Sequence, residues 1–175
     1  MLVNLKSNNT PGAKLPTTKF RLFIADITDV DINNWPEPTI ATISTDVLVT
    51  DIVTPRSWKY LDCKVGSMKP NAAPGESPLT GKLTLTPQIE GITKESLACL
   101  YDNNGRRVIV VWERCADRQK FIGGSPCSGG LEIKMSSIGD LDGGSSGIAL
   151  TFEGGDCPEP FYFYDFDAMV IAPDA

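Results

Sequence analysis

Short runs of β-branched and aromatic residues, separated by glycine and proline clusters, constrain the fold of this chain more than any other feature. The 175 residues include 16 glycines and 13 prolines, which fall mainly between the apolar runs. Proline and glycine interrupt helices and mark turns, whereas β-branched and aromatic residues favour strands. The pattern therefore predicts a mainly β chain.

The predicted strands are recognised by alternation of apolar and polar residues or by short, continuous apolar runs. RRVIVVWERC is the most apolar of them and predicts a buried strand over Val108 to Trp112. The predicted strand segments are residues 19–27, 39–53, 58–66, 82–91, 106–115, 119–124, 131–138, 147–153 and 160–172.

A single helix is predicted over about residues 93–103. Thr93 is a suitable N-cap, Glu95 lies in the first turn, and Leu97, Leu100 and Tyr101 form the expected apolar stripe. Gly105 is available for a left-handed C-terminal cap. Together with the strands, this helix predicts a two-sheet β-sandwich or barrel with one flanking α-helix.

The predicted domain organisation is an extended N-terminal arm, residues 1–18, followed by a single β-sandwich domain, residues 19–175. Within that domain, SMKPNAAPGESPLTG is predicted to be a long loop over residues 67–81, because it combines prolines, glycines and small polar residues. No apolar run has the length of a membrane span, and no signal peptide is evident at the start. We therefore expect a protein made in a cytoplasm, with no membrane partner.

The residue types available exclude several kinds of chemistry. The chain has no histidine, which excludes His-dependent catalytic triads and His-ligated metals. Five cysteines at irregular spacing favour reduced, mostly buried thiols over a zinc site. IGGSPCSGG lacks the lysine of a phosphate-binding loop, and the short acidic motifs at 29–33 and 140–142 are incomplete calcium loops. We expect no enzyme activity, no catalytic or metal-binding residue and no cofactor.

The charge is unevenly distributed along the chain. The net charge is −6, and the residues from Gly139 to the end include eight acids and no Lys or Arg. Such a segment repels phosphate, which suits a surface that nucleic acid must pass without binding. It is equally suited to a solvated face that keeps the protein soluble.

The aromatic stretch FEGGDCPEPFYFYDF, residues 152–166, admits more than one interpretation. With a period of two, Phe161 and Phe163 face one side, and Tyr162, Tyr164 and Phe166 face the other. Both sides are aromatic, so we expect both to be covered, one by the domain core and one by a neighbouring subunit. An alternative is a carbohydrate-binding β-sandwich that uses Trp35, Trp58 and Tyr162.

The order of elements resembles a known family. LTGKLTLTPQIEGITKESLACLYDNNGRRVIVVWERCADRQKFIGG and GGSSGIALTFEGGDCPEPFYFYD are similar to segments of the tail tube, or major tail, proteins of long-tailed bacteriophages, in the style found in phages of Bacteroidetes. The resemblance covers roughly residues 79–170. It implies a structural virion protein whose subunits form hexameric rings, which stack into a tail tube for DNA ejection.

The resemblance also implies partners and contact residues. The partners are further copies of the chain, other tail or neck proteins, and DNA in transit, in a tail assembled in the host cytoplasm. The expected inter-subunit contacts are Pro70, Pro74, Pro78, Tyr162, Tyr164 and Phe166. The expected lumen-facing acids are Asp140, Asp142, Glu153, Asp156 and Glu159. A virion neck, ring or terminator protein of related fold is the main alternative.

Overall fold

The structure is a computed structural model that describes residues 20–37, 39, 58–64, 66–74, 81–114, 118–139, 147–155 and 161–164. Its strands are β1 (Phe20–Asp26), β2 (Lys59–Cys63), β3 (Asn71–Pro74), β4 (Gly81–Leu85), β5 (Gln88–Glu90), β6 (Arg107–Glu113), β7 (Lys120–Gly123), β8 (Leu131–Ser137), β9 (Gly147–Gly154) and β10 (Phe161–Phe163). The helices of these residues are α2 (Lys94–Asn103) and the 3-10 turns η1 (Ile27–Asp29), η2 (Ile32–Asn34) and η3 (Pro126–Ser128).

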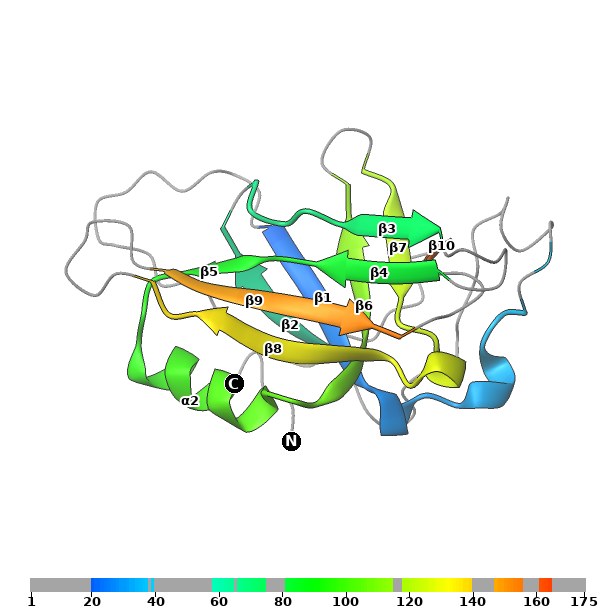
Figure 1. Ribbon diagram of the computed structural model, residues 1–175, viewed down its shortest axis with the longest axis horizontal. Coiled ribbons are helices and arrows are strands. Elements are labelled where there is room, and N and C mark those ends of the chain that lie inside the picture. The colour runs from blue at the N-terminus through cyan, green and yellow to red at the C-terminus, as the bar shows by residue number, and fades with distance from the viewer. Residues whose placement is uncertain are drawn as a thin grey trace.

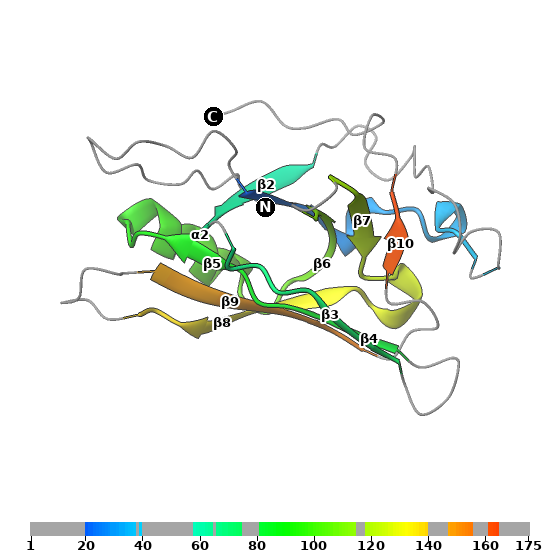
Figure 2. The same ribbon diagram turned by 90° about the horizontal axis from the view of Figure 1, so that it is seen from above.

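The strands form one antiparallel network in the order β10-β7-β6-β8-β9-β4-β3, with β1 paired to both β2 and β6, and β5 paired to β9 (Figure 1). Figure 2 shows that this network bends into two layers, with β1 and β2 on one side and β8, β9, β4 and β3 on the other. The described strands do not close into a ring. The mainly β fold with one helix is confirmed.

Strand β6 belongs to both layers. Near its start, Arg107 and Val108 pair with Glu132 and Leu131 of β8. On the same edge, residues 110–113 pair with β7, while residues 108–111 pair with β1 on the opposite edge. Figure 2 shows β6 curving from the layer of β8 and β9 toward the other layer. The strand therefore provides the bend by which one sheet becomes two layers.

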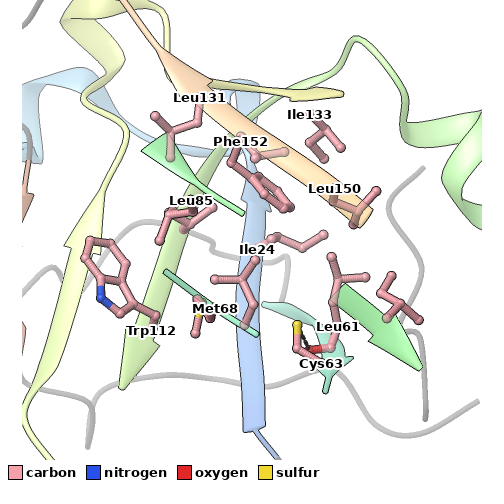
Figure 3. Close-up of a cluster of buried hydrophobic side chains, with 14 of the residues drawn as sticks. Ile24, Leu61, Cys63, Met68, Leu85, Trp112, Leu131, Ile133, Leu150 and Phe152 are labelled. Atoms are coloured by element: carbon pink, nitrogen blue, oxygen red, sulfur yellow. Dashed lines mark hydrogen bonds between the residues drawn. The ribbon is translucent and has the colours of Figure 1, made fainter. Parts of the chain in front are cut away.

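Alternation along the strands divides the apolar side chains between two cores. The first, the inter-layer core, lies between the two layers and is shown in part in Figure 3. The second, the outer core, covers the opposite face of β1, β2, β6, β7 and β10. Leu22 and Ile24 of β1 enter the inter-layer core, whereas Phe23 and Ala25 enter the outer core, as a period of two requires.

Helix α2 packs against the inter-layer core. The hydroxyl of Thr93 accepts from the backbone N–H of Ser96, and the Ser96 hydroxyl accepts from that of Thr93, which forms a capping box. The buried positions are Ser96, Leu100 and Asn103, so the buried face follows a helical period through them. The prediction that Tyr101 belongs to this stripe is wrong: it lies about 100° around the helix from Leu100 and is 65% exposed.

The prediction of a continuous loop over residues 67–81 is also wrong. Met68 is buried in the inter-layer core, and β3 pairs in register with β4, which places Ala72 opposite Leu83. Small residues allow this short strand to lie close against the core, and proline is tolerated at the end of a strand at a sheet edge. Residues 75–80, the predicted arm 1–18 and most of the predicted strand 39–53 lie outside the described residues.

The glycine-rich segment between β7 and β8 is a tight connection, as predicted. Gly124 has a φ of 94°, and a Cβ built on it would lie 2.9 Å from the backbone oxygen of Val108. Gly130, with a φ of 70°, would place a Cβ 3.0 Å from the same oxygen. The chain therefore approaches β6 twice at a distance that only glycine permits.

Gly124→Ala is expected to destabilise the fold more than Gly105→Ala. Both glycines have positive φ, but a Cβ at Gly105 meets nothing within 4 Å. The shared backbone strain costs about 1–2 kcal/mol, and the clash with β6 adds about 1–3 kcal/mol to Gly124→Ala alone. Urea unfolding of both variants measures the difference. Equal losses of unfolding free energy would show that β6 and this loop are not in close contact.

Candidate functional site

The two faces of β10 differ in burial: Tyr162 on one face is buried, whereas Phe161 and Phe163 on the other are half-buried. Tyr162 and Tyr164 are 3% and 2% exposed and belong to the outer core. The Tyr162 hydroxyl donates to the backbone oxygen of Pro36 at 3.1 Å, and its ring meets Trp35 edge-on at 6.2 Å. These two tyrosines, predicted as inter-subunit contacts, thus offer almost no surface to a neighbour. Phe166 lies outside the described residues.

The same burial removes the basis for a carbohydrate site at the predicted aromatics. Trp35 and Trp58 are 8% and 3% exposed and share the outer core with Tyr162. Sugar recognition by aromatic residues requires a ring face open to solvent, and these rings are packed against one another and against β1 and β6. The three residues therefore act as core residues.

The other face of β10 forms an aromatic wall. Phe161 meets Phe121 edge-on at 5.6 Å, Trp112 stacks on Phe121 at 5.6 Å, and Phe163 lies 5.2 Å from Phe121. This cluster lies at the margin of the inter-layer core, where the two layers diverge. Its rings consequently border an opening as well as the core.

That opening is an apolar pocket of about 400 Å³ between the layers. One wall is aromatic, and the facing wall comes from β3, β4 and the turn before β3. Pro70, a predicted inter-subunit contact, is exposed on this wall, and Pro74 ends β3. Pro78 lies outside the described residues. The lining residues are Gly66, Met68, Pro70, Ala72, Leu83, Trp112, Glu113, Arg114, Phe121 and Phe161.

The outward face of β8, β9 and β4 is polar. Glu153, a predicted lumen-facing acid, is exposed there, but its carboxylate lies 3.4 Å from Lys134. Lys134 is also 3.8 Å from Glu132, which lies 4.0 Å from Arg107. The charges of β8 and β9 on this face are therefore paired with opposite charges, and exposed Lys82 of β4 adds a further cation. The other predicted acids, Asp140, Asp142, Asp156 and Glu159, lie outside the described residues.

The acidic motif at residues 29–33 is a turn, as expected. Asp31 caps η2 by accepting from the backbone and side-chain nitrogens of Asn33, each at 2.9 Å. Asp26 caps η1 in the same way through Thr28. Within the described residues, no group of three or more acids or cysteines is arranged to hold a metal ion. The helices among these residues do not have the length and apolar character needed to cross a bilayer.

The structure adds a buried ion pair that sequence reasoning missed. Asp62 is 1% exposed, and Arg21, its partner in the β1–β2 register, donates to it from Nε at 2.8 Å. The guanidinium also lies over the Tyr60 ring, 4.1 Å from its centre. The alternation of side chains along the sequence puts Asp62 on the same face as Trp58 and Tyr60. Only the pairing of β1 with β2 identifies Arg21 as the cation that stabilises it. The pair is a structural element of the outer core.

Comparison with protein-family models finds no match, and comparisons with curated proteins and with solved structures find none that is significant. Support for a function therefore comes from the sequence and structure of this chain alone.

The described cysteines differ in their environments. Burial raises the pKa of the Cys63 thiol to about 12 from an ordinary value of 9.0, and the nearby Asp62 carboxylate adds to this increase. Burial also raises the pKa of Cys99, against a hydrogen bond from Asn103 that lowers it. Cys127 is free and exposed, and Cys115 and Cys157 lie outside the described residues.

Iodoacetamide is expected to alkylate Cys127 in the folded protein and to leave Cys63 unmodified until the protein unfolds. The raised pKa of Cys63 also makes stability depend on pH. The free energy of unfolding is unaffected by this thiol below about pH 9 and falls as the pH rises toward 12, because the thiol ionises in the unfolded chain first. Peptide mass spectrometry of native and urea-unfolded samples measures both sites. Rapid native labelling of Cys63 would contradict the buried position of β2.

Proposed function

We propose that this chain is a structural virion protein that self-assembles into rings, which stack into a phage tail tube through which DNA is ejected. The ring is proposed to be hexameric and the fold tail-tube-like, a β-sandwich or barrel, as in the family that the sequence resembles. The observation that best supports this proposal is the combination of an open sheet edge and an apolar pocket at β3.

Strand β3 pairs only with β4 among the described strands. Unpaired strand edges attract strands from other chains, and proteins that remain monomeric usually protect such edges with charge or bulk. β3 has the sequence NAAP, and Asn71 and Ala73 are exposed. Residues 71–73 of this edge carry no charge and no proline, so they suit pairing with a second copy, and Pro74 limits the pairing to this short stretch.

The apolar pocket adjoins the same edge. Ala72 of β3 lies in its wall, opposite Trp112, Phe121 and Phe161. A strand added to β3 would direct alternate side chains toward this pocket, so backbone pairing and apolar burial would occur together. Association would thereby remove both an open edge and an apolar surface from water.

The polar outward face suits contact with DNA in transit. Its described side chains on β8, β9 and β4 include no aromatic residue, so bases have no platform on which to stack. Arg107 and Lys134 lie beside carboxylates and are less available to phosphates, and Lys82 of β4 is a further exposed cation on this face. These features suit the passage of DNA without retention. The acidic residues from 140 onward would further disfavour retention by repelling phosphates.

Purified protein is expected to form rings or tubes in negative-stain micrographs, and Asn71→Lys, opposite Thr84 in the β3–β4 register, to prevent their formation. The lysine places a charge on the β3 edge, where pairing with another chain would have to desolvate it. Thr84→Lys, with the same added charge on β4 inside the sheet, is the matched control and should still assemble.

Circular dichroism and melting temperature verify that both variants fold. A wild-type protein that stays monomeric at high concentration would reject self-assembly. Normal rings from Asn71→Lys would reject the β3 edge as the contact. Rings that never stack would favour the neck or terminator alternative over a tube.

A further inference from the structure

A second pocket, of about 380 Å³, differs completely in character from the apolar one. It lies where the turn after β2 overhangs β5 and the neighbouring parts of β8 and β9. Among the described residues, its lining contains two lysines, four hydroxyl residues and one glutamine, with no aromatic residue and no carboxylate. The lining residues are Lys64, Gly66, Ser67, Lys69, Thr86, Gln88, Ser136, Ala149, Leu150 and Thr151.

The two lysines distinguish this pocket electrostatically. Elsewhere on the described surface, several cations lie against carboxylates, as Lys134 does with Glu153 at 3.4 Å and Arg118 does with Glu113 at 3.0 Å. Neither Lys64 nor Lys69 has an ion pair within the described residues, and the two share one concavity. In a chain of net charge −6, the pocket is therefore a local site of positive potential.

Hydrogen bonds fix the position of the turn that forms the pocket wall. The Lys64 backbone N–H donates to the Gln88 oxygen at 2.7 Å. The Ser67 hydroxyl donates to the Lys64 oxygen at 2.7 Å and accepts from the Gln88 N–H at 3.0 Å. Both lysines thus project from a segment attached to β5 at several points, which lowers the entropic cost of ordering a ligand between them.

The pocket floor supplies further donors. The hydroxyls of Ser136 and Thr151 are hydrogen-bonded to each other. Since one hydroxyl donates to the other, one hydroxyl proton of the pair remains available to a ligand. By register, Thr86 lies beside Thr151 on the adjoining β4–β5 segment. Ammonium and hydroxyl donors therefore surround a space without carboxylates or aromatic rings.

We propose that this pocket binds a phosphate oxyanion, with Lys64 and Lys69 as charged donors and with Thr86 and the Ser136–Thr151 pair as neutral hydroxyl donors. Charge-assisted hydrogen bonds from lysine suit phosphate oxygens. Absence of carboxylates from the lining disfavours a metal ion, and absence of aromatic rings disfavours recognition by stacking on a sugar or base. The inference goes beyond the proposed function and does not depend on assembly.

Inorganic phosphate titrated at constant ionic strength is expected to give saturable shifts of the Ser67, Gln88 and Thr151 amides in ¹H–¹⁵N NMR spectra. Lys64→Ala/Lys69→Ala should weaken binding at least about tenfold, because two charge-assisted bonds are lost. Lys59→Ala/Lys94→Ala is the matched control: it removes equal charge outside the pocket and should bind as the wild type does. Melting temperatures verify that both variants fold.

A short DNA duplex, added to the phosphate-bound protein, distinguishes two sources of the oxyanion. Displacement of phosphate by the duplex would identify a nucleic-acid backbone as the source, and persistence of the phosphate shifts would identify a free phosphate or small phosphate ester. Shifts that fail to saturate, or equal weakening in both double variants, would overturn the proposal, since either result indicates general screening of surface charge.

Discussion

The fold depends on the burial of both faces and both edges of β6. Val108 to Trp112 are at most 4% exposed, and their side chains alternate between the inter-layer core and the outer core. Because β8 and β7 pair with successive parts of one edge and β1 pairs with the other, the two layers are connected through this strand. A polar residue within it would be buried in one core or the other, at a cost that few single substitutions exceed.

The open end of the sheet follows from the same arrangement. At one end, Lys64 of the turn after β2 bonds to Gln88 of β5 and α2 packs on the core, so the layers are held together. At the other end they diverge, and the aromatic rings of β6, β7 and β10 face β3 across the apolar pocket. Stability of the domain and its proposed capacity to associate therefore have a common origin in how β6 bends the sheet.

Much of the fold follows from local sequence patterns. The helix has its cap and C-terminal glycine in the sequence, and the run VIVVW predicts a fully buried strand. The open edge at β3 could not be predicted, because NAAP has weak strand propensity and its pairing with β4 depends on tertiary contacts. The burial of Tyr162 by Trp35 and Pro36 likewise joins segments 126 positions apart, which no local pattern reveals. The polar pocket combines lysines and hydroxyls from segments spread between positions 64 and 151.

We propose that copies of this chain meet at the β3 edge. Hydrogen–deuterium exchange on dilute protein and on isolated large assemblies tests it most directly, since it reports backbone protection strand by strand. Slow exchange is expected in β6 in both samples, with protection of residues 71–74 that appears only in the assemblies. Assemblies in which residues 71–74 exchange as fast as in dilute protein would contradict it.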